Sequence, residues 1–249
     1  MRLAIVGRGR MGAAIRSVAR ELGHDVVLEI DTKSPLVGGP TSSALGDVEV
    51  ALDFTTPHAV VDNLRVLAEA QVSVVVGTTG WHQELDVVRE LAGTHGIGVV
   101  YAANFSIGAN VLLQAVRRAA ALLSEMPEFD AYVLEHHHRN KVDAPSGTAL
   151  SLASAIVDES ETKDRIVAGT PEGRLDASAL HVASVRAGYV FGRHVVGFDG
   201  PSDLVELTHL AKGREGFARG ALKAAEWVRG RRGVFEFQSV LEREGKEGT

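Results

Sequence analysis

The sequence contains no cysteine, and this absence excludes several kinds of chemistry. A chain of 249 residues without cysteine has no disulfide, no thiolate metal site and no cysteine nucleophile. No apolar run approaches the ~20 residues of a membrane-spanning helix, and the apolar run near Met1 is too short for a signal peptide. We therefore expect a soluble, unprocessed protein of the cytoplasm, with no membrane partner.

The sequence also lacks an excess of positive charge. Its 26 basic and 32 acidic residues give a net charge of -6 at pH 7. A general nucleic-acid-binding protein needs a basic surface, so we expect no nucleic-acid partner. Hydrophobic residues at 45% and charged residues at 23% are ordinary for a globular protein, and the length favours two domains.

A glycine-rich turn follows the first apolar run. Leu3-Ala4-Ile5-Val6 is followed by Gly7-Arg8-Gly9-Arg10-Met11-Gly12 and then by a helical pattern from Ala13 to Leu22. In a dinucleotide-binding turn, the first glycine permits the tight turn, the second lets a pyrophosphate approach, and the third allows close helix packing. Such a motif is weak on its own, since an unrelated α/β protein can also contain a glycine turn.

The second apolar run strengthens the dinucleotide interpretation. Asp25-Val26-Val27-Leu28-Glu29-Ile30-Asp31 ends in an acid 19 positions after Gly12, near the spacing at which a carboxylate meets the adenosine ribose. Asp31 favours NADH because it repels the 2′-phosphate of NADPH, whereas Lys33, Arg8 and Arg10 offer positive charge to that phosphate. We predict that residues 7–12 and Asp31 bind NADH, NADPH or both.

Further strands alternate with helices. Strands are predicted at 48–55, 72–76 and 97–102, with a helix from Pro57 to about Ala70. Continuous apolar strands suit a parallel sheet covered on both faces, and ligands bind beyond the carboxyl ends of such strands. Two stretches lie there: Gly77-Thr78-Thr79 and Ala102-Ala103-Asn104-Phe105. Taken alone, both also read as ordinary turns.

The second half of the chain has a different pattern. A long helix from Ile107 to about Ser124 leads to strand-like runs at 129–138, 180–186, 194–198 and 204–209, and a helix from Glu215 to Arg229 returns to the first domain. The later strands have no long helix between them, which favours a mixed or antiparallel sheet. We predict a Rossmann-type doubly wound parallel sheet at 1–108 and 215–249, and an α+β substrate and oligomerisation domain at 109–214.

Cationic side chains gather at the end of the run 129–138. Glu135-His136-His137-His138-Arg139-Asn140-Lys141 precedes Asp143-Ala144-Pro145-Ser146-Gly147-Thr148, after which residues 149–157 have a helical pattern. Strand alternation places His137 opposite to His136 and His138. Amides at a helix start bind anions, so we expect a small carboxylate substrate beside groups that supply a proton. A solvated charged loop is the main alternative, and a zinc site is a weaker one because the histidines lack the usual ligand spacing.

The same stretch carries a resemblance to a known family. The run Glu135-x-His137-His138-Arg139-x-Lys141-Val142-Asp143-Ala144-Pro145-Ser146-Gly147-Thr148-Ala149 resembles the signature of the dihydrodipicolinate reductases. The likeness extends over nearly the whole chain, through Gly77-Thr78-Thr79-Gly80, residues 102–108, Arg186-Ala187-Gly188 and Thr208-His209. Thr32 stands where the family commonly has an arginine, and the glycine loop is often one residue longer in the family.

The resemblance implies a reaction and roles for the residues. The family reduces 4-hydroxy-tetrahydrodipicolinate, or its dehydrated form, to tetrahydrodipicolinate with NADH or NADPH in diaminopimelate and lysine biosynthesis. It implies that His137 is the general acid, that Lys141 is a second proton donor, and that His138, Gly147 and Thr148 bind substrate. It also implies that residues 77–79 and 102–105 contact the dinucleotide and that the open sheet face forms a homotetramer.

Several alternatives stay open at this point. Lys141 alone fits electrostatic substrate binding as well as proton transfer. Another Rossmann-type dehydrogenase, or a protein that binds NAD(H) without catalysis, would share the first domain. The basic cluster beside helix-start amides favours an enzyme, because a sensor needs no dicarboxylate site.

Overall fold

The computed structural model describes residues 1–31, 36 and 45–242. Contacts divide the chain into two compact units, Met1–Ile107 with Arg214–Thr249 as unit 1 and Gly108–Gly213 as unit 2. Each boundary lies one residue before the predicted one. Lys33 and the charged tail expected beyond Glu242 lie outside the described residues.

Unit 1 is built on a parallel sheet of six strands in the order β11-β5-β4-β3-β1-β2. Its strands are β1 (Arg2–Val6), β2 (Asp25–Ile30), β3 (Val50–Asp53), β4 (Ser73–Val76), β5 (Gly98–Tyr101) and β11 (Gly233–Glu236). Every residue of β3 and β4 is buried. Strands buried on both faces explain the continuous apolar runs in the sequence.

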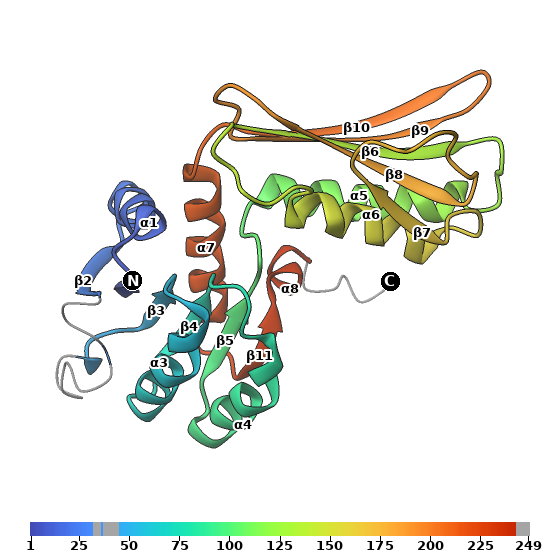
Figure 1. Cartoon of the computed structure of the whole chain (residues 1–249). Helices are drawn as coiled ribbons and strands as arrows, with labels where there is room; N and C mark the ends of the chain where they lie inside the picture. Colours follow the sequence, from blue (N-terminus) through green and yellow to red (C-terminus); the bar gives the residue numbers. More distant parts are fainter. Residues whose placement is uncertain (32–35, 37–44, 243–249) are drawn as a thin grey trace. The chain divides into compact units, whose positions relative to one another are not determined.

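Helices cover both faces of this sheet (Figure 1). On one face lie α1 (Arg10–Glu21) and α7 (Glu215–Val228), and on the other lie α3 (Pro57–Glu69) and α4 (Leu85–His95). A 3₁₀ turn at His82–Glu84 and the short α8 (Phe237–Leu241) complete the unit. The predicted doubly wound α/β class is therefore confirmed.

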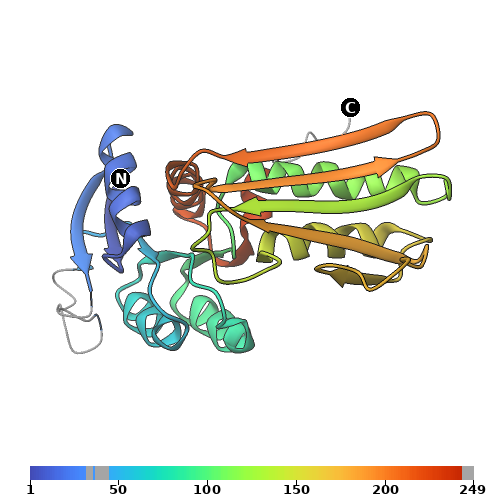
Figure 2. The same ribbon diagram turned by 45° about the horizontal axis from the view of Figure 1, so that its top comes forward.

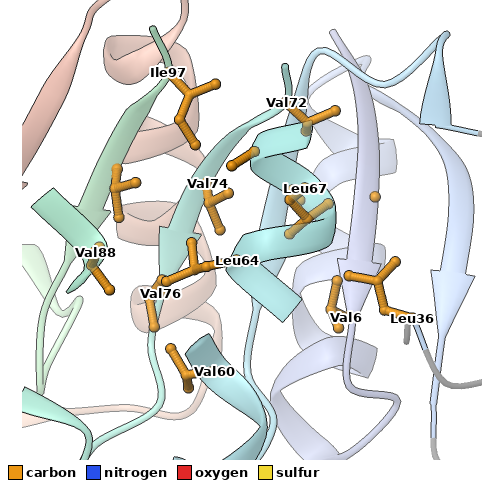
Figure 3. Packing of buried hydrophobic residues seen from close by; sticks show 14 of the residues in the cluster. Val6, Leu36, Val60, Leu64, Leu67, Val72, Val74, Val76, Val88 and Ile97 are labelled. Carbon is orange, nitrogen blue, oxygen red and sulfur yellow. The ribbon is translucent and has the colours of Figure 1, made fainter. Parts of the chain in front are cut away.

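The core beneath α3 and α4 is made of branched aliphatic side chains. Figure 3 shows Leu64 and Leu67 of α3 and Val88 of α4 beside Val74 and Val76 of β4. All five side chains are at most 1% exposed. Burying such a side chain contributes about 1.5–3 kcal/mol, so this layer fixes β4 and the turn that follows it.

Unit 2 contains a five-stranded sheet in the order β10-β9-β6-β8-β7. The strands are β6 (Asp130–His137), β7 (Arg165–Ala168), β8 (Ala179–Arg186), β9 (Gly192–Asp199) and β10 (Leu204–Ala211). β8 runs parallel to β6 and β7, whereas β9 runs antiparallel to β6 and β10. The sheet is mixed, as the short spacing between the later strands predicted.

One face of the unit 2 sheet is covered by helices. α5 (Ile107–Leu123) and α6 (Gly147–Glu159) pack their apolar sides against β6, β8 and β9. Figure 2 shows both helices behind the strands, with no helix in front of them. Within the described ranges, no helix is long and apolar enough to cross a membrane.

Candidate active site

The glycine turn after β1 has the geometry of a phosphate-binding turn. Gly7 adopts φ +103°, which favours glycine, and a Cβ at Gly12 would lie 2.1 Å from the carbonyl oxygen of Gly7. A Cβ at Gly9, by contrast, would meet nothing within 4 Å. The first glycine therefore permits the turn, the third permits close helix packing, and the second leaves open space at the start of α1.

A cavity of about 390 Å³ adjoins this turn in unit 1. It is lined by Gly9, Arg10, Met11, Phe54, Thr55, Pro57, Gly77, Thr78, Thr79 and Arg214. The cavity brings together two stretches that are far apart in the sequence and were both predicted to bind cofactor. Glycine is required at position 77, because a Cβ there would lie 1.9 Å from the ring of Phe54.

A buried acid stabilises one wall of the cavity. Asp53 ends β3 and accepts hydrogen bonds from the N–H and hydroxyl of Thr55, at 3.0 and 2.6 Å, and from the amide of Asn63 at 2.9 Å. Burial raises the pKa of Asp53, while these donors lower it. Thr55 is thereby fixed where it lines the cavity.

Asp31 directly follows β2 and is paired with the glycine turn. Arg8 Nη1 lies 3.5 Å from Asp31 Oδ2, and Arg8 Nε lies 3.4 Å from Glu29 Oε2. Asp31 is expected to contact the adenosine ribose, and Arg8 is expected to contact a 2′-phosphate. Here the two side chains are paired with each other. Arg8 therefore lies between two carboxylates, those of Asp31 and Glu29.

The stretch 102–105 follows β5, as predicted. Asn104 Oδ1 accepts a hydrogen bond from Ser106 N at 2.8 Å. Phe105 is 2% exposed, and its ring packs against Phe54 and Phe237 with centroids 6.0 and 4.9 Å away. The Phe105 side chain is therefore part of the core, and what this residue offers a ligand is its backbone. Ala102 is partly buried and Ala103 is exposed.

The end of β6 holds a carboxylate and an imidazole on the same buried face. Ala131, Val133, Glu135 and His137 alternate with more exposed residues, so His137 points away from His136 as predicted. The His137 Nδ1 atom is hydrogen-bonded to Glu135 Oε2. The Glu135 side chain is fully buried and also pairs with Arg186, whose Nη1 and Nη2 lie 2.9 and 2.6 Å from its two oxygens.

The pKa values of this pair follow from burial and from their partners. Burial raises the pKa of Glu135, but hydrogen bonds from Arg186, His137 and the Ser146 amide outweigh it and lower the pKa to about 2. Burial is the main cause that lowers the pKa of His137; Glu135 raises it, and Lys141 and Arg186 lower it further. Lys141 therefore lowers the pKa of His137, but burial has the larger effect.

Lys141 lies in the loop after β6 and is paired locally. Its Nζ lies 2.8 Å from Asp143 Oδ1, with 25% of the lysine side chain exposed. The carbonyl oxygen of Asp143 in turn accepts a hydrogen bond from Arg186 Nη2 at 2.5 Å. Lys141 and Arg186 are therefore both tied to Asp143, and the loop that carries Lys141 is fixed relative to β8.

The start of α6 is capped by a side chain. Ser146 is the N-cap residue, and its Oγ accepts a hydrogen bond from Ala149 N at 3.2 Å. The helix begins at Gly147, two residues before the predicted helical run 149–157, and a Cβ at Gly147 would meet nothing within 4 Å. Thr148 follows in the first turn and is partly buried. The backbone at this helix start thus borders open space.

His138 connects the loop to the turn after β8. Its backbone N–H donates to the Val190 carbonyl at 2.7 Å, and its ring meets Phe191 edge-on at 6.5 Å. Nδ1 of His138 is buried and has no hydrogen-bond partner among the residues with described positions. The predicted substrate-binding histidine therefore carries an unused polar atom.

Three residues of the sites were given no role by the sequence pattern. Glu135 shared a strand face with His137, and this two-residue spacing was the available signal. Arg186 is 51 residues from Glu135 and meets it only through the pairing of β6 with β8. Arg214 lines the cofactor cavity from the start of α7, and no local pattern distinguishes it.

Among the described residues, no group of three or more His, Asp or Glu side chains is placed to hold a metal ion.

The fold and these two sites define an oxidoreductase that uses a dinucleotide cofactor. The dihydrodipicolinate reductase N-terminus profile matches residues 1–105, and the C-terminus profile of the same family matches residues 108–241. The chain therefore belongs to the dihydrodipicolinate reductase family. Its reaction is the NAD(P)H-dependent reduction of 4-hydroxy-tetrahydrodipicolinate, a step of lysine and diaminopimelate biosynthesis.

Individual relatives cover nearly the whole chain. A 4-hydroxy-tetrahydrodipicolinate reductase of Christiangramia forsetii is 32% identical over 243 residues, covering 97% of this chain and 98% of the relative. One from Acinetobacter baumannii is 36% identical over 264 aligned positions, covering 96% of each chain. The dipicolinate-bound dihydrodipicolinate reductase of Paenisporosarcina sp. TG-14 superposes with a TM-score of 0.78 at 25% identity, covering 96% of this chain and 98% of that one.

Proposed function

We propose that His137 is the general acid of this reductase, with Lys141 as an assisting second proton donor. The observation that carries the proposal is the hydrogen bond between His137 Nδ1 and the ionised, buried carboxylate of Glu135. An ionised carboxylate only accepts hydrogen bonds, so Nδ1 must carry the hydrogen. The proton is then gained and released at Nε2 of His137.

We propose further that the substrate is held by its two carboxylates. His138 and the backbone N–H groups of Gly147 and Thr148 bind one end of the dicarboxylate, since helix-start amides attract anions. Lys141 supplies positive charge beside His137. Binding of the dicarboxylate raises the pKa of His137 and so favours the protonated acid where it is needed.

The cofactor fits the turn and cavity of unit 1. The open space at Gly9, the cavity walls at residues 77–79, and Asp31 beside Arg8 match the pyrophosphate and adenosine-ribose ends of a dinucleotide. When bound, NADH or NADPH would supply the hydride that adds to the unsaturated ring conjugated with the C=N bond; the 4-hydroxyl group leaves as water, and the ring C=N bond is retained in tetrahydrodipicolinate. The chain supplies the matching proton through His137, so that one hydride and one proton complete the reduction.

The test is turnover with freshly generated substrate, followed by the loss of NADH absorbance. We expect His137→Gln to bind cofactor normally while turnover falls by about 10²–10⁴-fold, the range for the loss of a general acid. His136→Gln is the matched control, because its side chain lies on the opposite face of β6. Near-normal turnover of His137→Gln would remove this residue from the role.

We also propose that the chain forms a homotetramer through the helix-free face of the unit 2 sheet, as the family resemblance implies. This face exposes Leu134, Val185, Leu204 and Leu210, which are 37%, 41%, 53% and 53% exposed. Large apolar side chains exposed on a sheet face that no helix of the unit covers support an interface there. Sedimentation should give the mass of four chains, and Leu204→Glu should lower it, whereas a monomeric native protein would contradict the proposal.

A cytoplasmic location is proposed on composition. A chain with no cysteine suits a reducing compartment. Cell fractionation with an antibody against the chain tests it, and recovery from the secreted or periplasmic fraction would contradict it.

A further inference from the structure

The carboxylate of Glu135 receives more donors than a surface acid would. Oε1 accepts from Arg186 Nη2 at 2.6 Å and from the Ser146 backbone N–H at 3.1 Å. Oε2 accepts from Arg186 Nη1 at 2.9 Å and from His137 Nδ1. With a side chain that is 0% exposed, Glu135 depends on these donors for its charge.

The residues that donate hydrogen bonds to Glu135 come from different parts of unit 2. Arg186 lies on β8, directly opposite His137 in the strand register. Ser146 is the N-cap of α6 and also contacts His194 on β9, with its Oγ 3.1 Å from His194 Nε2. One carboxylate therefore joins the proposed proton donor, the neighbouring strand and the residue from which the first turn of α6 begins.

We infer that Glu135 is a positioning residue that fixes the tautomer of His137 and holds its imidazole in register with the start of α6. The inference rests on the proposed function of His137. Through Ser146, the same carboxylate sets the position of the Gly147 and Thr148 amides relative to the imidazole. A change at Glu135 would then disturb proton delivery and carboxylate binding together.

A purely stabilising role explains the arrangement less well. Removing two charges from water is costly, and a buried ion pair is commonly no more stabilising than packed apolar side chains. A simple Glu135–Arg186 pair would also need no second donor on Oε2. The additional hydrogen bond to His137 is what a general acid requires, because it leaves Nε2 as the atom that exchanges the proton.

The charged groups that face His137 determine how its pKa should change when the Glu135 carboxylate is removed. They are Glu135 on its own strand, Arg186 from β8, Lys141 from the following loop and His194 from β9, with His209 of β10 stacked beyond His194. Of the partners that act on the pKa of His137, Glu135 raises it, whereas Lys141 and Arg186 lower it. Loss of the carboxylate should therefore lower that pKa.

The experiment compares Glu135→Gln with the native holoenzyme over a range of pH. A general acid must be protonated, so kcat falls above its pKa, and we expect this fall to move down by about 1–3 pH units in the variant, the usual effect of one close charge. Glu125→Gln is the matched control, because Glu125 is an exposed acid just after α5 and lies on no strand of the unit 2 sheet. Its pH profile should equal that of the native enzyme.

A second measurement reads the tautomer directly. In ¹⁵N-histidine-labelled protein, with His137→Gln used for assignment, the native His137 should carry its neutral-state hydrogen on Nδ1. An amide at position 135 can donate to Nδ1, so Glu135→Gln should move that hydrogen to Nε2. An unchanged tautomer with an unchanged pH profile would overturn the inference, and His137→Gln retaining turnover would instead refute the proposed function.

The single variant leaves the Arg186 charge without its carboxylate and can fail to fold. In that case Glu135→Gln combined with Arg186→Met removes both ends of the ion pair and restores a folded chain for the same labelling experiment. Arg186 does not contact His137 Nδ1 among the hydrogen bonds described, so the tautomer still reports on position 135. Retention of the native tautomer in this double variant would contradict the inference.

Discussion

Gly192 lies against the Nε2 edge of His137: a Cβ at Gly192 would come within 2.9 Å of that nitrogen. The two residues are neighbours across the antiparallel pair of β6 and β9, whose register places Arg193 opposite His136. Glycine at this position leaves no methyl group against Nε2, the atom of the imidazole that is proposed to exchange the proton. The strand backbone alone gives no reason for a glycine, since the positive φ angles of the described chain do not include Gly192.

We predict that Gly192→Ala folds but lowers kcat by about 10²-fold, at the low end of the range for losing a general acid. The added methyl group must displace the ring that Glu135 holds, or cover its Nε2 atom. Gly93→Ala in α4 is the control, because a Cβ there meets nothing within 4 Å. Steady-state kinetics at saturating NADH decide the matter, and an unchanged kcat for Gly192→Ala would contradict proton transfer at Nε2.

The pairing of Arg8 with Asp31 leads to a prediction on cofactor preference. Asp31→Ala removes a ribose acceptor and a repulsive charge, and it releases Arg8 from the 3.5 Å ion pair. We expect NADH binding to weaken by about 10-fold, as for one charge-assisted hydrogen bond, while NADPH binding is unchanged or stronger. Both dissociation constants are measured at one salt concentration.

Asp25→Ala provides the control for this experiment, because Asp25 is an exposed acid at the opposite end of β2. Its effect on the two cofactors should be small and equal. An equal loss of NADH and NADPH affinity in Asp31→Ala would show that Asp31 does not contact the adenosine ribose.

The role of Lys141 is tested with a planar inhibitor. Pyridine-2,6-dicarboxylate presents two rigid carboxylates and does not readily accept hydride, so it should compete with substrate. We expect Lys141→Ala to weaken the inhibitor by about 10-fold as well as to slow turnover, because a charged hydrogen bond to a carboxylate is lost. Calorimetric titration with NADH present measures the affinity.

Two outcomes separate the possible roles of this lysine. Slow turnover with unchanged inhibitor affinity would identify Lys141 as a proton donor that does not bind substrate. Lys223→Ala on the exposed side of α7 should change neither quantity. Failure of the native protein to bind the inhibitor at all would contradict the dicarboxylate site.

The buried His194 should make stability depend on pH. Burial, followed by the neighbouring charges of His137, His209 and Lys141, lowers the pKa of His194 to about 4, from 6.5 in the unfolded chain. Below pH 6.5 the unfolded chain binds the proton more readily, so stability is present in full above that pH and is lost as pH falls towards 4. The loss from this group amounts to about 3 kcal/mol.

Urea midpoints measured between pH 7 and pH 4 test this prediction. Replacing the imidazole in His194→Gln should flatten the decrease in stability over that range, whatever the change in stability at pH 7. His58→Gln, at an exposed position in α3, should retain the native slope. An identical slope in the His194 variant would show that this imidazole is not kept neutral by the fold.

The parts of the fold that the sequence predicted are those with strong local patterns. Apolar runs marked the strands of unit 1, and Gly7 and Gly12 have the turn and packing geometry that their spacing indicated. α4 was not predicted, although Leu85, Val88 and Leu91 recur at helical spacing; Gly93-Thr94 interrupts the pattern in its last turn. β7 was also missed, because a four-residue edge strand with two exposed ends has little pattern.

The chemistry of the site was predictable only where it was local. His137, Lys141 and Gly147 belong to one continuous stretch, and their proximity follows from the chain itself. The Glu135–Arg186 pair instead depends on the register of β6 against β8, which no spacing in the sequence specifies. Burial lowers the pKa of His137 more than Lys141 does, and the sequence could not predict this either. The burial of His137 is known only once β8, β9 and α6 are in place.

The close packing of α7 on the loop after β5 has a consequence for synthesis of the chain. A Cβ at Gly220 would lie 1.8 Å from the carbonyl oxygen of Phe105, so α7 sits directly where the chain leaves unit 1. Ribosomes complete β1 to β5 before residues 108–213 emerge, but α7 and β11 follow them. Until then the apolar surface of Val75, Val100 and Phe105 lacks the helix that buries it. The nucleotide-binding unit is thus the first whose synthesis begins and the last whose synthesis is completed. A chain truncated after Ile107 should aggregate rather than bind cofactor.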